Sequence, residues 1–301
     1  MTTKTAIAKI EENDTKVAQK LDANDRVIEQ KTGLAIFMPT EFDALDADEE
    51  MQAALAANGE AEGNISASDL VRIKTPSGGS TNWIIETIAG EEMTDEIEGV
   101  LVSYQATGVL WPNDDPQDGD KPVLRTFNPS SPHAVAELVG NEEDIPKAMQ
   151  KELARCKISD GVYDWNQLSY NAWGSGANGT GKRCKEQRML FILRKNDVYP
   201  VLVTCQPGSL SAMTKFFKQL TPTLRKPYWH AVVSLKLTCE KSAGKGVKFS
   251  RIKPTLSGCI PAETAKEVYN NFTKPLERIS KTITPDAGSE SAPSQSGAAP
   301  Y

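Results

Sequence analysis

Residues 66–282 alternate short β-prone apolar runs with turn residues, and this alternation limits the architectures open to the chain. The run 96–112 alternates apolar and polar residues, and clusters of Gly, Pro, Ser, Asn and Asp separate it from its neighbours. Turn residues, and not regular helical crossovers, join the runs, which favours an antiparallel sheet or a small barrel over a doubly wound parallel sheet. We therefore predict an α+β, mainly β, fold in which an antiparallel sheet or barrel carries peripheral helices.

The pattern predicts strands at 69–75, 81–88, 96–112, 123–128, 189–195, 198–205, 228–241 and 246–256. The first two strands are expected to form a hairpin around the turn at 76–80. Helical spacing predicts one or two short helices within 131–155, and helices at 209–220 and 261–280. The last of these helices begins with Pro261, and proline is favoured in the first turn of a helix.

The composition of the two ends differs from that of the strand-rich core. Residues 1–65 are expected to form an acidic helical or disordered arm, because 4–31 carry a thin apolar stripe at helical spacing and 41–62 contain many acids and no base. The core contains a Gly- and aromatic-rich insertion at 156–187. The low-complexity residues 283–301 are expected to form a disordered C-terminal tail.

Charge is distributed unevenly along the chain. Residues 1–150 carry 11 Lys and Arg and 29 Asp and Glu, whereas residues 151–301 carry 23 basic and 11 acidic residues. The net charge of -6 conceals this division. Such asymmetry is typical of a basic binding surface combined with an acidic appendage.

A Gly-rich stretch at 174–188 matches the frame of a nucleotide-binding phosphate loop. Gly176, Gly181 and Lys182 have the spacing G-x-x-x-x-G-K, but Arg183 stands where Ser or Thr should bind Mg²⁺. A phosphate loop also needs a buried strand before the glycines and a helix after them. The preceding residues lack a strand pattern, and the following MLFIL resembles a strand. We therefore interpret the stretch as a flexible loop that leads into a cluster of bases.

Bases and aromatic residues are interleaved through the second half of the chain. Residues 155–253 hold 18 Lys and Arg and five acids. Single-stranded nucleic acid is held by this combination, with cations along the backbone and flat rings beneath the bases. A single ring is more often part of a core, but Trp165, Tyr170 and Trp173 are favoured as stacking platforms because their surroundings are polar. The candidate DNA-binding residues are Lys182, Arg183, Lys185, Arg188, Arg194, Lys195, Trp165, Tyr170, Trp173, Lys215, Lys218, Arg225, Lys226 and Trp229.

Four segments follow one another in the order IKTPSGGSTNWIIE, IEGVLV with a later Trp, WGSG with GTGKRCKEQRMLFIL, and YPVLVTCQPGSLSAMTKFFKQL. Over residues 70–255 this order resembles a group of phage and mobile-element proteins of DNA replication or recombination modules. The strand-rich core also resembles the OB-type single-stranded DNA-binding proteins of phages. The resemblance implies an OB-like core with single-stranded DNA as the partner, and the residues themselves predict no catalytic activity.

Proteins of this group carry a four-cysteine, zinc-like cluster, and the resemblance places Cys156 and Cys184 at half of such a site. Two thiolates are half of a structural zinc site. Asp160, His133 or Cys205 could complete it only with unusual spacing. We therefore expect no cofactor and keep zinc as a weak candidate.

Other functions remain as alternatives. The basic half could instead bind an acidic protein, as a phage structural or regulatory interaction module would, and the acidic arm could recruit replication or recombination proteins. A nucleotide hydrolase or a metal-dependent nuclease is less favoured, because the chain has only His133 and His230 and no ordered catalytic triad. No apolar run has the length of a membrane span or of a secretory signal, which predicts a cytoplasmic protein without a membrane partner.

Overall fold

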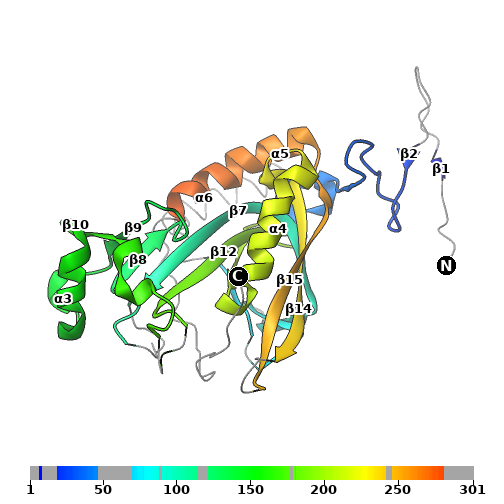
Figure 1. The fold of residues 1–301 in the computed structure, drawn as a ribbon. Coiled ribbons are helices and arrows are strands. Elements are labelled where there is room, and N and C mark those ends of the chain that lie inside the picture. The colour runs from blue at the N-terminus through cyan, green and yellow to red at the C-terminus, as the bar shows by residue number, and fades with distance from the viewer. Residues whose placement is uncertain are drawn as a thin grey trace.

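The structure is a computed structural model that describes residues 7–8, 19–46, 70–76, 78–87, 90–113, 121–176, 179, 181–241 and 246–280. The fold is α+β and mainly β (Figure 1). Its strands are β1 (Ile7–Ala8), β2 (Gln19–Lys20), β3 (Ala35–Ile36), β4 (Arg72–Lys74), β5 (Trp83–Thr87), β6 (Gly90–Thr94), β7 (Glu96–Leu110), β8 (Leu124–Phe127), β9 (Val135–Leu138), β10 (Lys157–Ser159), β11 (Val162–Asp164), β12 (Cys184–Arg194), β13 (Val201–Cys205), β14 (Ala231–Lys241) and β15 (Lys248–Cys259).

The helices are few and lie at the periphery of the sheet. The α-helices are α1 (Asp43–Asp46), α3 (Lys147–Cys156), α4 (Leu210–Leu224), α5 (Ala262–Val268) and α6 (Lys274–Ile279). A π-helical turn η8 (Tyr269–Thr273) joins α5 to α6. Short 3₁₀ turns include η3 (Trp165–Gln167), η4 (Ser169–Asn171) and η7 (Tyr228–His230). In the described residues, no helix is both long and apolar enough to span a bilayer.

The long strand β7 organises an eleven-stranded mixed sheet. Strand β12 pairs with it in antiparallel fashion along most of one edge. On the other edge, β14 pairs with residues 96–100 and β8 pairs with residues 107–110. Residues 101–106 pair with no described strand on that edge, and we call this interruption the notch.

From β7 and β12 the sheet extends in three directions. One branch runs through β14 and β15 to β3, another through β13 to β4, and a third through β8, β9 and β11 to β10. Strand β3 runs parallel to β15 and β4 runs parallel to β13, whereas the other pairs are antiparallel. Because these branches end at β3, β4 and β10, the described strands do not close into a barrel.

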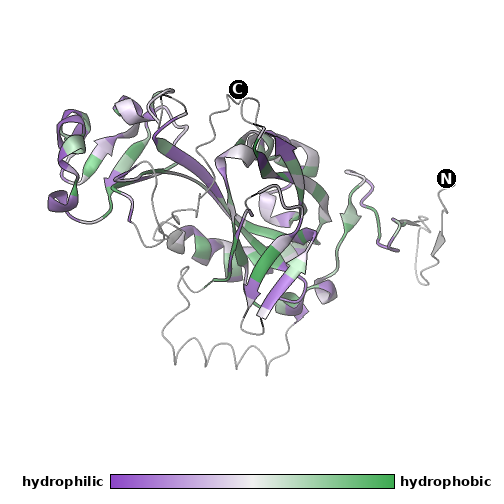
Figure 2. Ribbon diagram, turned by 90° about the horizontal axis from the view of Figure 1, so that it is seen from below, coloured by the Kyte–Doolittle hydropathy of each residue, from purple (hydrophilic) through white to green (hydrophobic). Residues whose placement is uncertain are grey.

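Helices cover both faces of the central sheet. Alternation along β7 sends Ile97 and Leu101 toward α4 and the β5–β6 hairpin, while Val100 and Val102 face α5 and α6. Figure 1 shows α4 lying across one face, and α5 and α6 running along the other. Figure 2 shows hydrophobic residues along the strands at the centre of the molecule. A third apolar cluster lies between α3 and strands β8, β9 and β11.

A one-residue irregularity in β7 sets the orientation of the side chains next to the notch. Phe191 pairs with Ser103 and Ile192 pairs with Leu101, so Val102 is an extra residue in the ladder. The shift places Tyr104 opposite Leu190, on the face that carries α4. Gly99 pairs regularly with Arg194, and a Cβ atom at Gly99 would come within 2.3 Å of the Leu193 carbonyl oxygen.

Several predicted elements differ from the structure. The predicted hairpin of strands 69–75 and 81–88 is wrong, because β5 pairs with β6 and β4 joins β13. Within 131–155, where one or two short helices were predicted, residues 135–138 instead extend the sheet as β9, and helix α3 begins only after Pro146. In each case sheet pairing with distant strands overrides the local pattern.

The described part of the N-terminal arm also departs from the predicted helical form. Residues 19–36 form turns and bridges, including Leu21 with Val27, and no helix. Phe37 and Phe42, which follow directly, are buried against the α5 side of the sheet, so residues 35–42 belong to the core. Most of the acidic stretch 41–62 and the tail 283–301 lie outside the described residues.

Candidate nucleic-acid interface

A groove of about 650 Å³ opens at the notch in β7. Strand β7 supplies one wall, helix α4 supplies another, and η7, α6 and the loop after β8 supply the rest. We call it the notch groove. It is lined by Ser103, Tyr104, Gln105, Ala106, Asn128, Ser130, Arg188, Thr214, Phe217, Lys218, Tyr228, Glu277 and Ser280.

Arg188 is the cation at the floor of the notch groove. It lies opposite Ala106 in the β7–β12 ladder and is half-buried. Its Nη1 atom is buried and has no hydrogen-bond partner. A buried donor left without a partner destabilises a protein by about 1–3 kcal/mol, more when the group is charged. An anionic ligand in the groove would pair with the part of the Arg188 side chain that lines it.

Aromatic rings form the wall beside Arg188. Tyr104 stacks on Phe217 with ring centroids 4.1 Å apart and an interplanar angle of 19°. The edge of Tyr228 meets Tyr104 at 5.0 Å. Tyr104 is 37% exposed, so a face or edge of this ring is open to a ligand. Burial raises the pKa of Tyr228 to about 12, so its hydroxyl stays neutral at physiological pH.

Helix α4 adds exposed cations above the groove. Lys215, Lys218 and Arg225 are exposed, and the structure gives them no ion pair within the residues it describes. Arg225 ends the helix in a left-handed conformation with φ of 56°, and its backbone N–H donates to the Thr221 carbonyl. The predicted candidates Arg188, Lys215, Lys218 and Arg225 therefore all lie in the notch groove or on α4.

Other predicted cations are held in ion pairs, many with acids of the N-terminal half. Lys226 contacts Glu29 at 2.7 Å, and Arg194 binds both Glu92 and Asp197. Similar pairs join Lys195 to Glu41 and Glu98, and Lys182 to Glu186. The charge division of the sequence is thus partly neutralised in the fold. Lys185 is half-buried on β12.

The predicted stacking platforms differ in exposure. Trp165 is 0% exposed and packs among the residues of the third apolar cluster, so the prediction that it stacks on bases is wrong. The Arg183 guanidinium lies 4.9 Å from the centre of the Tyr170 ring and covers it. Trp173 is 56% exposed and remains accessible. Trp229 packs on Tyr228 and Tyr269 and is partly buried.

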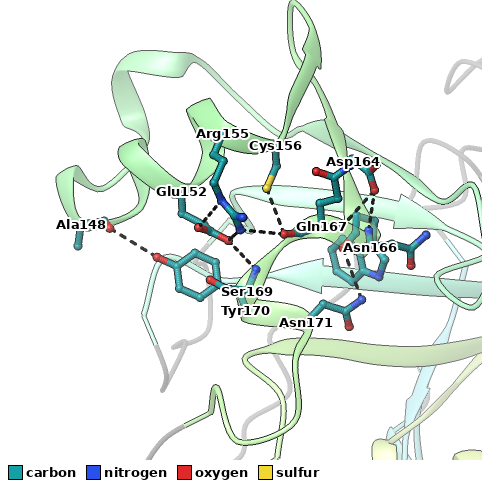
Figure 3. A network of polar contacts seen from close by, with 11 residues as sticks. Ala148, Glu152, Arg155, Cys156, Asp164, Asn166, Gln167, Ser169, Tyr170 and Asn171 are labelled. Atoms are coloured by element: carbon teal, nitrogen blue, oxygen red, sulfur yellow. Dashed lines mark hydrogen bonds and ion pairs between the residues drawn. The ribbon is translucent and has the colours of Figure 1, made fainter.

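A polar network holds the region 165–171 against α3 (Figure 3). Glu152 accepts hydrogen bonds from Arg155 and from the backbone N–H of Ser169. The carbonyl of Gln167 accepts from Arg155 and from the Cys156 thiol. The Arg155 guanidinium lowers the pKa of Glu152 to about 2. This network fixes the loop that precedes the Gly-rich stretch.

Substitution of Glu152 by glutamine is expected to destabilise the fold by about 1 kcal/mol at neutral pH, because one charged acceptor is lost. The folded pKa of about 2 lies below the ordinary value of 4.5, so this stabilisation is present above about pH 4.5 and is lost as the pH falls toward 2. Urea unfolding followed by tryptophan fluorescence at pH 7 and pH 3 measures it. The difference in free energy of unfolding between the wild type and E152Q should be smaller at pH 3 than at pH 7. Glu143→Gln, at an exposed site outside the network, should leave the free energy of unfolding unchanged at both pH values.

The Gly-rich stretch is not built as a nucleotide-binding loop. Strand β12 begins at Cys184, directly after the glycines, where a phosphate loop requires a helix. Lys182 is bound to Asn171 and Glu186, and Arg183 donates to the Pro112 carbonyl. These contacts use the two cations to fasten the loop, which removes the phosphate-cradle interpretation.

The cysteines are placed as apolar residues. Cys156 and Cys184 lie in the third apolar cluster, and burial raises the pKa of both thiols, that of Cys184 to about 12. Zinc binds the thiolate and not the thiol. Within the described residues, no three His, Cys, Asp or Glu side chains are placed to hold a metal ion, so the candidate zinc half-site is not completed there.

Comparison of the chain with protein families, with curated proteins and with solved structures finds no match. Tyr104 and Gln105 are groove residues that the sequence pattern assigned only to a strand. Their orientation depends on the irregularity at Val102, which leaves no signal in the order of residues.

Proposed function

We propose that this chain is a non-catalytic, largely sequence-independent single-stranded DNA-binding protein that supports DNA replication or recombination in a phage or mobile element. The observation that carries the proposal is the notch groove, whose lining includes both the half-buried Arg188, which has no described ion pair, and the partly exposed ring of Tyr104. A phosphate would accept from the guanidinium, and a base would stack on the aromatic wall.

Single strands fit this groove better than a duplex does. Stacking on Tyr104 requires an unpaired base, because the faces of paired bases are covered by their neighbours. The cations of α4 would contact the backbone phosphates without reading the bases, which accounts for weak sequence dependence. An OB-like arrangement is part of the proposal, since OB-type proteins also hold single strands against a curved antiparallel sheet.

A titration of binding against salt tests the function. Labelled oligothymidylate, its duplex and the matching RNA are compared at several salt concentrations by fluorescence anisotropy. We expect tighter binding to the single strand than to the duplex, with an affinity that falls as salt rises. Undetectable binding at low salt, or an affinity that does not change with salt concentration, would contradict the proposal.

An acidic protein partner is the second candidate, because Lys215, Lys218 and Arg225 could also contact carboxylates. A pull-down treated with nuclease separates the two. A discrete partner that remains bound, together with no binding to oligonucleotides, would favour the protein-interaction module.

Glu277→Gln should strengthen binding of single-stranded DNA by about two- to five-fold at low salt. Glu277 is the one acidic residue among those that line the notch groove, and it would repel a phosphate held by Arg188. The gain should shrink as salt screens the charge. Glu263→Gln, an exposed change on α5 outside the groove, is the matched control and should leave affinity unchanged.

A further inference from the structure

A second groove of about 600 Å³ lies on the opposite flank of α4 from the notch groove. Its walls are α4 and the outer parts of β14 and β15. We call it the flank groove. It is lined by Ala212, Lys215, Phe216, Gln219, Thr238, Cys239, Glu240, Arg251, Ile252, Lys253 and Pro254.

Four consecutive residues of α4 are divided between the two grooves. Lys215 and Phe216 line the flank groove, whereas Phe217 and Lys218 line the notch groove. At 100° per residue, the two lysines straddle the solvent-facing crest of the helix. Figure 1 shows α4 lying between β7 and β12 on one side and β14 and β15 on the other.

A row of rings runs beneath α4 from one groove to the other, packed against the core on the inner side of the helix. Tyr104 stacks on Phe217 at 4.1 Å, and Phe217 meets Phe216 edge-on at 5.6 Å. The crossing is short, because a helix with its side chains is about 10–12 Å in diameter. A single strand that leaves the notch groove would pass Lys218 and Lys215 before reaching the flank groove.

The charge of the flank groove suits a polyanion. Lys215 and Lys253 are exposed, and the described part of the chain offers them no ion pair. The acid in the groove, Glu240, already accepts from Arg251 at 2.9 and 3.2 Å. Exposed lysines without a described ion pair thus lie at both ends of the path over α4.

We propose that the flank groove is a second DNA subsite, so that one single strand runs from the notch groove across the crest of α4 and fills both grooves. This inference rests on the proposed function and extends it. Phosphates contact Lys218 and Lys215 on the crest and Lys253 beyond it. Short oligonucleotides fill only the notch groove, and longer ones occupy both.

Cys239 provides a direct readout of occupancy in the flank groove. It lines this groove and is exposed, whereas the other four cysteines of the chain are buried. A maleimide added to the native protein should therefore modify Cys239 selectively, and peptide mass mapping identifies the site. The rate of modification is measured with oligothymidylates of about 4 to about 16 nucleotides, the range of site sizes known for OB folds.

We expect the shortest oligonucleotides to bind and leave the rate at Cys239 unchanged. Longer ones should lower the rate about ten-fold when present at about ten times their Kd. The double variant Lys215→Ala and Lys253→Ala should lose this protection. For the long oligonucleotide, the slope of log affinity against log salt concentration (the salt slope) should become shallower by about 1.4, at about 0.7 for each lost phosphate contact. Lys241→Ala, an exposed change at the end of β14 outside both grooves, is the control and should retain protection.

The outcomes separate this inference from the proposed function. Salt-sensitive binding of oligonucleotides without protection of Cys239 at any length would overturn the second subsite alone. Absence of binding would overturn both proposals. Protection by an acidic peptide such as polyglutamate, but not by oligonucleotides, would assign the flank groove to an acidic protein partner and would also overturn the inference.

Discussion

Replacing Arg188 by alanine should weaken the binding of single-stranded DNA about 10- to 100-fold, because a hydrogen bond to a charged group contributes about 1.5–3 kcal/mol. The salt slope should fall by about 0.7, as expected when one phosphate contact is lost from a single strand. The side chain of Arg188 makes no described hydrogen bond within the protein, and its Nη1 is buried without a partner. The free energy of unfolding of R188A should therefore equal or exceed that of the wild type.

Two companion variants sharpen this experiment. Arg188→Lys keeps the charge but loses the planar fork of donors, so it should recover the salt slope and only part of the affinity. Lys241→Ala removes an exposed charge away from the grooves and should have little effect. If R188A folds normally and binds single strands as tightly as the wild type, the notch groove is not the phosphate site.

Tyr104→Ala should weaken binding about 5- to 100-fold, since stacking on an aromatic side chain contributes about 1–3 kcal/mol per base. No charge is lost, so the slope of affinity against salt should stay unchanged, in contrast to R188A. Tyr104→Phe keeps the ring and should bind nearly as well as the wild type. Fluorescence anisotropy at several salt concentrations measures both quantities.

Trp173 supplies the matched control for the stacking experiment. Its ring is 56% exposed, more than that of Tyr104, but it does not line the notch groove. Trp173→Ala should leave affinity nearly unchanged if stacking takes place in the groove. A large loss in W173A with none in Y104A would move the stacking site to the loop before the Gly-rich stretch. Urea unfolding of Y104A checks that the contacts with Phe217 and Tyr228 are not required for folding.

The distribution of apolar residues predicted the class of the fold and much of its strand content. Alternation through 96–112 and the apolar run after Arg188 correspond to β7 and β12, the two central strands. Such runs report burial directly, since side chains of a strand point alternately to its two faces. The absence of a helix after Lys182 was also predictable, because MLFIL has no helical spacing.

Strand partners and ion pairs could not be predicted from the sequence as well as the strands themselves. Strand β4 joins β13 across more than a hundred residues, although the nearest strand pattern suggested a hairpin with 81–88. Glu29 and Glu92, which belong to the acidic half of the sequence, form ion pairs with Lys226 and Arg194 in the fold. These pairings depend on distances that only the folded chain establishes, and so a count of charges along the sequence overstated the basic surface.

The exposure of single aromatic residues was also hard to predict from the sequence. Polar neighbours in the sequence suggested that Trp165 was exposed, yet α3 and strands of the β8 branch cover it completely. Tyr104 belongs to a strand pattern that suggests burial, yet an irregularity at Val102 and the gap between β14 and β8 leave its ring accessible.

The residue types alone therefore specify a mainly β protein with cations and rings interleaved in its second half. Which of them face a common groove was decided by tertiary structure. Arg188 and Tyr104 are 84 positions apart, and they meet because β7 and β12 pair in one register and α4 packs over them. Register and packing are long-range properties, and a one-residue shift would send these side chains to the opposite face.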